Sequence, residues 1–257
     1  MQQQEVIYAF VRELEVRMEH PLKIHQHDEY YTIFPEDKDY ILIFYSKNAS
    51  HRIDSSLVRT FHIDIDQIQT SSSKILHRLS ALLGRGKAIY ARQTVVARID
   101  KKVAMEFQQE HHLQVALPGK YRYGLFCNGE LISLAVFSGG RHMRDIPETE
   151  RSFELLRFCH KSDLRVVGGL SKLIRALAKD FNPYNIMTYV DKDWSQESNL
   201  TTLGFAATGT IPPQRFWITN GERHYIANEQ NLQLLQEKYP QGYLKHNSGS
   251  TKLVLIL

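Results

Sequence analysis

The chain has 257 residues, of which 42% are hydrophobic and 23% are charged, and its formal net charge is +4. This balance is typical of a folded globular protein, and no apolar run approaches the roughly 18 residues that a membrane-spanning helix needs. Acidic residues within the apolar N-terminal stretch exclude a secretory signal, and the two cysteines, Cys127 and Cys159, are too few for a disulfide framework. The sequence therefore predicts a cytoplasmic protein with no membrane partner, and its mild basic charge neither requires nor excludes nucleic acid.

The first third of the chain changes from a helical to an extended pattern and back. Residues 4–18 carry apolar side chains at helical spacing, which predicts an amphipathic helix. Three segments rich in β-branched and aromatic residues predict strands: YYTIF, DYILIFY and VRTFHIDI. Polar residues at 35–39 predict a hairpin between the first two strands. Ser71–Ser73 then offer N-caps for a helix that Gly84 ends, so we expect a small α/β domain over residues 1–84.

The remainder of the chain, residues 85–257, predicts a second domain. AIYARQTVVARI predicts a strand, Asp100 caps a helix, and Asn128-Gly129 suits the tight turn of a hairpin. Further strands are predicted at FELLRFCH, IMTYVD, RFWI, RHYI and KLVLIL, with helices after the first of them, before Gly204 and near 228–238. This order is typical of an α/β (α+β) fold with a mixed sheet and helices on its faces, which we expect over residues 87–226.

The turn at Gly168 and Gly169 has a sequence that is typical of anion-binding turns. The segment from Asp163 to Lys172 takes a predicted strand through Gly168 and Gly169 directly into a helix. The free amide groups at such a helix N-terminus stabilise a pyrophosphate or a similar anion. Glycine matters here because a side chain would hold the ligand away from the backbone. The turn therefore predicts an anion-binding site.

The spacing Arg165-x-x-Gly168-x-Leu170 resembles the acyl-CoA-binding motif of the GNAT (acyl-CoA N-acyltransferase) superfamily, Arg/Gln-x-x-Gly-x-Gly/Ala. The chain departs from that motif at Leu170, where a small residue is usual. Leu203-Gly204-Phe205 is similar to the sequence that closes the fourth helix of the fold. The resemblance implies a mixed, mostly antiparallel GNAT-like sheet flanked by helices. It also implies that acetyl-CoA or another acyl-CoA is held by Arg165, Val167, Gly168, Gly169, Ser171 and Lys172.

A narrower resemblance covers about residues 61–257. The sequence segments that show this resemblance are IYAR, ELLRFC, VVGG-x-SKL, NP-x-x-I and YVDKDWS. They are similar to proteins of phages and mobile elements that join a homing- or very-short-patch-repair-type endonuclease domain to a GNAT-like C-terminal domain. This resemblance implies that the N-terminal domain, residues 1–84, is a degenerate nuclease-like domain.

Acyl transfer to an amine of a small molecule or peptide needs a base for the amine proton and an acid or water for the leaving thiolate. The superfamily often supplies the acid from a tyrosine at the position of Leu200, which cannot donate a proton. Glu154 lies where the family often carries a carboxylate and is the candidate catalytic residue, although it could instead pair with a neighbouring arginine or lysine. Strand alternation places Glu154, Leu156 and Phe158 on one face, and Cys159 on the other is expected to be inert packing.

If the nuclease resemblance holds, residues 25–83 should resemble a core in which carboxylates on neighbouring strands hold a divalent cation. Thr32 and Phe44 occupy the expected carboxylate positions, and neither binds a metal. Two alternating sets could bind a cation by themselves: His62, Asp64 and Asp66, and also His25, His27 and Glu29. Such alternation is more often a solvated strand face, so we predict no metal site.

Two functional hypotheses follow. The first is a GNAT-like N-acyltransferase that binds acyl-CoA at the strand-Gly-helix turn. The alternative is a catalytically inactive, DNA-associated accessory protein derived from a mobile-element endonuclease.

Overall fold

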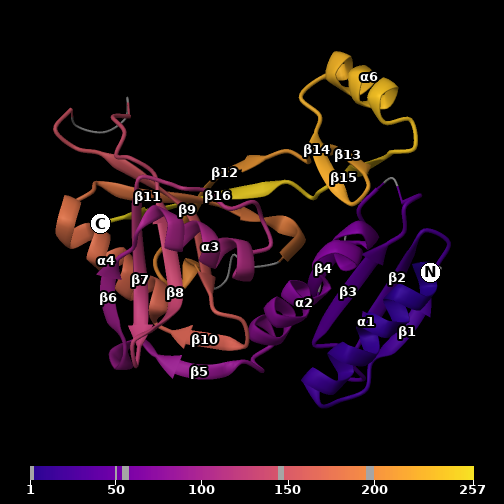
Figure 1. Ribbon diagram of the computed structural model, residues 1–257, viewed down its shortest axis with the longest axis horizontal. Coiled ribbons are helices and arrows are strands. Elements are labelled where there is room, and N and C mark those ends of the chain that lie inside the picture. The colour runs from indigo at the N-terminus through magenta and orange to yellow at the C-terminus, as the bar shows by residue number, and fades with distance from the viewer. Residues whose placement is uncertain (1–2, 50, 54–57, 144–147, 195–199) are drawn as a thin grey trace. The chain divides into compact units, whose positions relative to one another are not determined.

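The computed structural model describes residues 3–49, 51–53, 58–143, 148–194 and 200–257 (Figure 1). The chain divides into two compact units, each built from segments that are distant in sequence. The first unit comprises residues 1–72, 190–198 and 210–251, and the second comprises 73–189, 199–209 and 252–257. The boundary predicted after Gly84 stays a prediction.

The N-terminal part of the first unit is a four-stranded sheet with the order β1-β2-β3-β4. Its first three strands are antiparallel, whereas β3 and β4 run parallel. The predicted helix packs on it through Phe10, whose ring lies 5.3 Å from that of Phe44. The bounds are α1 (Gln3–Met18), β1 (Lys23–Gln26), β2 (Tyr30–Phe34), β3 (Tyr40–Tyr45) and β4 (Arg59–Asp64) (Figure 1).

The helix after β4 begins earlier than the sequence suggested. α2 spans Ile65–Leu82, so Asp66 lies on this helix and not on a strand beside His62 and Asp64. Ser71 has φ −140° and ψ 27°, which breaks the helix where the sequence placed its N-cap. The side chain of Gln67 accepts a hydrogen bond from the Asp64 amide at 3.0 Å and so supports the earlier start.

The first unit also contains a three-stranded antiparallel sheet with the order β14-β13-β15. Its elements are β13 (Arg215–Thr219), β14 (Glu222–Tyr225), α6 (Glu229–Lys238) and β15 (Tyr243–His246). β13 and β14 were expected in the large mixed sheet, and that expectation is wrong, because they pair with β15 instead. The sequence analysis predicted no strand at β15, whose four residues, YLKH, show no clear alternation of apolar and polar side chains.

The large sheet has seven strands in the order β12-β16-β11-β9-β8-β7-β6. β6 to β9 pair antiparallel, and β9 pairs parallel with β11. The predicted hairpin is present, with Asn128 (φ 51°) and Gly129 (φ 82°) in its turn. The bounds are β6 (Val95–Arg98), β7 (Tyr121–Cys127), β8 (Glu130–Phe137), β9 (Ser152–His160), β11 (Asn185–Asp191), β12 (Ala206–Ile211) and β16 (Ser250–Ile256).

Helices cover both faces of this sheet. α3 (Lys101–His111), which Asp100 caps as predicted, packs through Phe107 on the face that carries Val136. α4 (Gly169–Phe181) lies against the other face, where Phe181 contacts Tyr121 with ring centroids 4.1 Å apart. The predicted fold class, α/β (α+β) with a mixed, mostly antiparallel sheet flanked by helices, is confirmed.

The segment expected to form one strand after Gly86 is divided in two. β5 (Lys87–Tyr90) ends at the short helix η1 (Ala91–Gln93), and β6 follows. β5 pairs parallel with β10 (Leu164–Val167) in a separate two-stranded sheet. The sequence suggested one strand from Phe153 into the glycine turn, whereas β9 ends at His160 and β10 is a separate strand. This pairing places η1 beside the start of α4.

The short helix expected before Gly204 falls partly on residues 195–199, which lie outside the described residues. Its end is present, because the Gly204 amide donates to the Thr201 carbonyl and Gly204 has φ 94°.

Within the described residues, no helix combines the length and the apolar character that crossing a membrane requires.

Candidate functional site

The predicted anion-binding turn has the backbone geometry that its glycines suggest. Gly168 is the N-cap of α4 with φ 76° and ψ 5°, a left-handed conformation that glycine adopts without strain. Because Gly168 has no side chain, nothing of its own caps the amides of the first helical turn. Those amides, with the positive end of the helix dipole behind them, can bind an anion.

Gly169 allows close packing between the start of α4 and β10, the strand that precedes the turn. A Cβ at Gly169 would lie 3.1 Å from Val166 Cβ and 3.4 Å from His160 Cε1. The start of α4 thus packs closely on Val166 of β10 and lies in ordinary contact with His160, the last residue of β9. Sequence reasoning did not select His160, which ends β9, one strand before β10 and the turn.

His160 lies in a protected position beside the turn. Its Nδ1 is 3.0 Å from Ser133 Oγ, within hydrogen-bonding distance. Burial lowers the pKa of His160 to about 4, so the ring is neutral near pH 7. At that pH it adds no charge to the site.

The structure brings together four of the six predicted ligand-binding residues in the first turn of α4: Gly168, Gly169, Ser171 and Lys172. Lys172, however, points at η1, where its Nζ donates to the Ala91 carbonyl at 2.8 Å and to the Thr94 carbonyl. Arg165 and Val167 lie on β10, both exposed, on either side of the buried Val166. Arg165 is therefore the residue of this set whose charge faces solvent near the turn.

β9 and β11 separate part-way along their length. Their parallel register pairs Asn185 with Ser152, Ile186 with Phe153 and Met187 with Glu154. The Thr188 hydroxyl then donates to the Leu155 carbonyl at 2.9 Å. Beyond this point the ladder ends, although β9 continues to His160 and β11 to Asp191. Backbone groups of both strands are thus left for another partner in the opening between them.

Glu154 lies at the last of these three pairs. Its amide donates to Ser138 Oγ at 2.9 Å, its side chain is partly exposed, and within the described chain its carboxylate forms no ion pair. Arg157 interacts with it electrostatically: burial lowers the pKa of that guanidinium and the charge of Glu154 raises it. The structure does not place Glu154 beside the glycine turn, because six residues of strand, roughly 20 Å, separate it from His160.

A β-bulge corrects the predicted faces of β9. Arg157 pairs with Val136 and Leu155 with Phe137, so Leu156 is an extra residue. Leu156 therefore packs in the cluster that holds Cys159, and it does not share a face with Phe158 as alternation suggested. Burial raises the pKa of the Cys159 thiol to about 12, so this cysteine remains a thiol and packs as expected.

In the first unit, Thr32 and Phe44 are the residues that the sequence comparison placed at the carboxylate positions of a nuclease, and that resemblance stays a prediction. Phe44 is fully buried on β3, and the Thr32 hydroxyl lies 3.2 Å from His27 Nε2. His62, Asp64 and Asp66 are buried, so the prediction of a solvated face is wrong. His62 Nδ1 instead lies 2.8 Å from the Tyr45 hydroxyl.

Asp64 is the centre of a buried charge cluster. Arg52 donates to both of its oxygens, at 2.7 and 2.9 Å, and Arg223 donates to Oδ2 at 2.6 Å. The Lys245 ammonium lies 3.7 Å from Oδ1. Burial alone would raise the pKa of Asp64, but Arg52, Arg223 and Lys245 hold it well below its ordinary value.

Two further carboxylates balance these cations. Arg223 also donates to Asp66 through Nε at 2.7 Å, and Arg52 donates to Asp193 at 3.2 Å. The oxygens of Asp64 are thus occupied by guanidinium groups. Among the described residues, no group of three or more His, Cys, Asp or Glu side chains is arranged to hold a metal ion.

We expect the purified protein to show no Mg²⁺-dependent DNA cleavage. Phe44 and Thr32 offer no carboxylate, and the carboxylate of Asp64 is already neutralised by Arg52 and Arg223. The measurement is incubation of supercoiled plasmid with the protein and Mg²⁺, followed by gel electrophoresis. Reproducible nicking that EDTA abolishes would contradict the expectation.

No protein-family model matches the chain, and no curated protein matches it. Solved structures that it resembles include the ribosomal-protein-S18-alanine N-acetyltransferase of Escherichia coli, with 13% identity over 63% of this chain and 93% of that one and a TM-score of 0.41. An acetyltransferase of Bacillus subtilis in complex with CoA has 14% identity over 64% of this chain and 99% of its own, with a TM-score of 0.39. A GNAT family acetyltransferase of Elizabethkingia anophelis with acetyl-CoA bound has 11% identity over the same two shares, 64% and 99%, and a TM-score of 0.37.

Proposed function

We propose that the chain is an acyl-CoA-dependent N-acyltransferase whose acyl-CoA binds at the Gly168–Ser171 turn. The observation that carries this proposal is the left-handed Gly168 at the uncapped start of α4, which packs closely on β10. The opening between β9 and β11 supports it. We further propose that the part of residues 85–257 that belongs to the second unit forms the acyltransferase domain.

The turn suits the pyrophosphate of CoA for two reasons. The amides of the first turn of α4 are available to oxyanions, and Gly168 leaves the approach to them free. Arg165, exposed on β10, adds positive charge nearby, whereas Lys172 supports the site by fixing η1 against α4. Acetyl-CoA or another acyl-CoA would supply the activated acyl thioester.

The opening between β9 and β11 suits an extended arm that carries amides. Such an arm can pair with backbone groups that the separating strands leave free, as an added strand would. The ladder ends at Glu154 and Met187, so an arm that starts at the glycine turn runs along β9 towards Glu154.

Glu154 is the proposed general base. Its carboxylate is partly exposed and lacks an ion pair among the described residues, so it can accept a proton from an amine of a small molecule or peptide. Leu200 cannot supply a proton to the leaving thiolate, so we assign that step to water.

The direct test is a calorimetric titration of the full chain with acetyl-CoA, together with an assay of free thiol release in the presence of amine acceptors. Dissociation constants in the micromolar range correspond to about −8 kcal/mol and would support the proposal. Absence of binding at acetyl-CoA concentrations near 1 mM would contradict it.

Glu154→Gln is expected to lower kcat by about 10²- to 10⁴-fold while acetyl-CoA binding stays within twofold of wild type. The amide keeps the shape of the side chain but cannot accept the amine proton. The matched control is Glu106→Gln on α3, an exposed glutamate 3.9 Å from Lys102. An unchanged kcat in Glu154→Gln would remove this residue from the proposed chemistry.

A further inference from the structure

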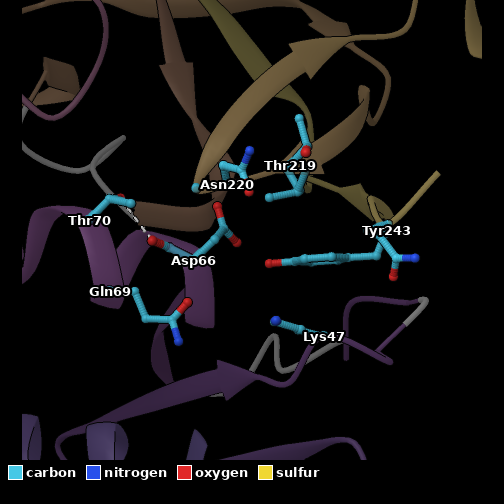
Figure 2. A pocket seen from close by; sticks show the side chains of 10 residues that line it. Lys47, Asp66, Gln69, Thr70, Thr219, Asn220 and Tyr243 are labelled. Atoms are coloured by element: carbon cyan, nitrogen blue, oxygen red, sulfur yellow. Dashed lines mark hydrogen bonds between the residues drawn. The ribbon is translucent and has the colours of Figure 1, made fainter. Parts of the chain in front are cut away.

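A cavity of about 490 Å³ lies in the first unit, whereas the glycine turn belongs to the second (Figure 2). It is within the usual size range of small-molecule sites. Its floor is formed by buried Asp66 and Ile218, and exposed side chains form its rim. The lining residues are Lys47, Asp66, Gln69, Thr70, Ile218, Thr219, Asn220, Gly221, Gln241 and Tyr243.

The wall of this cavity depends on a close contact that only glycine permits. Asn220 (φ 49°) and Gly221 (φ 80°) form the turn between β13 and β14. A Cβ at Gly221 would lie 2.5 Å from Thr70 Cγ2, so the absence of a side chain lets the turn lie against α2. Thr70 is itself held by a 2.8 Å hydrogen bond to the Asp66 carbonyl. This contact and this hydrogen bond thus fix one wall of the cavity.

Lys47 brings a positive charge that the cavity does not compensate. Asp66 is already paired with Arg223, and that pair belongs to the balanced charge cluster. Lys47 has no carboxylate partner among the described residues, and its Nζ lies 5.6 Å from the centroid of the Tyr243 ring. In Figure 2 the ammonium points into the space between Gln69 and Tyr243. The cavity therefore favours an anion.

The Tyr243 hydroxyl is a buried donor that lacks a hydrogen-bond partner in the described chain. Figure 2 shows it turned across the cavity towards Asp66. Burial raises the pKa of Tyr243, and the carboxylates of Asp66 and Asp64 raise it further, so the group stays protonated. A ligand oxygen placed between Lys47 and this hydroxyl would satisfy both.

Asp66 and the amide side chains add a preference for hydroxyl groups. Arg223 occupies one acceptor site on each oxygen of Asp66, and a carboxylate has about four in all. The remaining sites can accept from ligand hydroxyls. Gln69, Asn220 and Gln241, at the rim, can both donate and accept.

We propose that this cavity binds a small hydroxyl-bearing oxyanion, a sugar phosphate or a sugar acid, with Lys47 and Tyr243 holding the oxyanion and Asp66 accepting from a hydroxyl. This site is independent of acyl-CoA and of the reaction proposed above. It adds a second small-molecule ligand, bound by the first unit.

Calorimetric titration of the full chain tests this site with three probes: glucose phosphorylated at its primary hydroxyl, gluconate, and glucose itself. We expect one of the two anions to bind and glucose to bind at least tenfold more weakly than that anion. Tighter binding of the phosphate ester identifies a sugar phosphate, and tighter binding of gluconate identifies a sugar acid. Binding of neither anion at about 1 mM would overturn the proposal.

Two variants locate the site. Lys47→Gln and Tyr243→Phe are each expected to weaken the binding anion at least tenfold. The matched controls are Lys38→Gln, whose ammonium also lies over an aromatic ring, that of Phe34, and Tyr225→Phe on β14. Equal binding by both cavity variants and wild type would overturn the proposal. Gly168→Val is expected to leave binding of the anion unchanged, so the result does not depend on the acyl-CoA site.

Discussion

Asp64→Asn is expected to lower the free energy of unfolding by about 3–5 kcal/mol, because it removes the charge that pairs with buried cations. Asparagine keeps the shape of the side chain but leaves Arg52, Arg223 and Lys245 around a neutral amide. Asp64 is fully buried, so water cannot replace the lost interaction. Guanidinium unfolding followed by tryptophan fluorescence is a suitable measurement, since both tryptophans, Trp194 and Trp217, belong to the first unit.

The control for this variant is Glu36→Gln. Glu36 pairs with Lys23 at 3.1 Å, but their side chains are 86% and 55% exposed. An ion pair in water contributes roughly 0–1 kcal/mol, so this change should be small. Similar losses in the two variants would show that the buried cluster contributes no more than a surface pair.

The same contact predicts a dependence on pH. The pKa of Asp64 is lower in the folded protein than in the unfolded chain, where it is about 4. The stabilisation is therefore fully present above that unfolded-state pKa and is lost as the pH falls below it. The difference in stability between wild type and Asp64→Asn should shrink as the pH is lowered from about 5 to 2. A difference that grows on acidification would contradict this assignment.

Local patterns in the sequence predicted local structure well. Asn128-Gly129, Asp100 and Gly84 marked a hairpin turn, a helix start and a helix end, and the structure has each of them. These features depend on a few neighbouring residues and their backbone preferences. The start of α2 was missed because Ile65 and Ile68 continue the β-branched pattern of the strand before it.

Contacts between distant segments could not be read from the sequence. The partners of Asp64 include Arg223 and Lys245, which lie on β14 and β15. No local period connects them, and the strands that carry them are short. The sequence showed that His62 and Asp64 are alternating polar residues. It could not show that they are buried, because the segments that cover them are distant in sequence.

The glycine turn was predicted in position, but the roles of its side chains were not. Gly168 has the conformation that its residue type suggests. Lys172 was expected to face the ligand. Its ammonium instead donates to the carbonyl of Ala91 in η1 and to the carbonyl of Thr94, the residue before β6. That contact follows from the pairing of β5 with β10, which brings η1 beside α4. The pairing joins segments far apart in sequence.

Gly168→Val is expected to weaken acetyl-CoA binding by about 100-fold. If the turn holds the pyrophosphate, ligand oxygens must approach backbone amides to about 2.9 Å, and a side chain at Gly168 obstructs that path. Losing hydrogen bonds to a charged group costs about 1.5–3 kcal/mol each. Space within the protein is not the obstacle, because an added Cβ would lie 3.6 Å from Ala91 Cβ, an ordinary contact. Isothermal titration of acetyl-CoA is the measurement, with circular dichroism to confirm the fold.

Backbone strain must be separated from the effect on the ligand. Gly168 has φ 76°, and valine resists that conformation at a cost of about 1–2 kcal/mol. Gly84→Val is the matched control, since Gly84 has φ 86° and an added Cβ would meet no atom within 4 Å. This variant carries a similar strain away from the turn. It should lose similar stability and keep acetyl-CoA binding.

Arg165→Ala is expected to weaken acetyl-CoA binding less than tenfold, because an exposed charge is screened by salt. The order of effects therefore distinguishes backbone recognition from side-chain charge. If wild type binds acetyl-CoA and Gly168→Val binds it equally well, the anion lies elsewhere and Gly168 serves only to turn the chain into α4. If Arg165→Ala causes the larger loss, the site depends on a side-chain charge and the amides of α4 contribute little. A large loss in Gly168→Val, with Gly84→Val unaffected, is the result that the geometry of this turn requires.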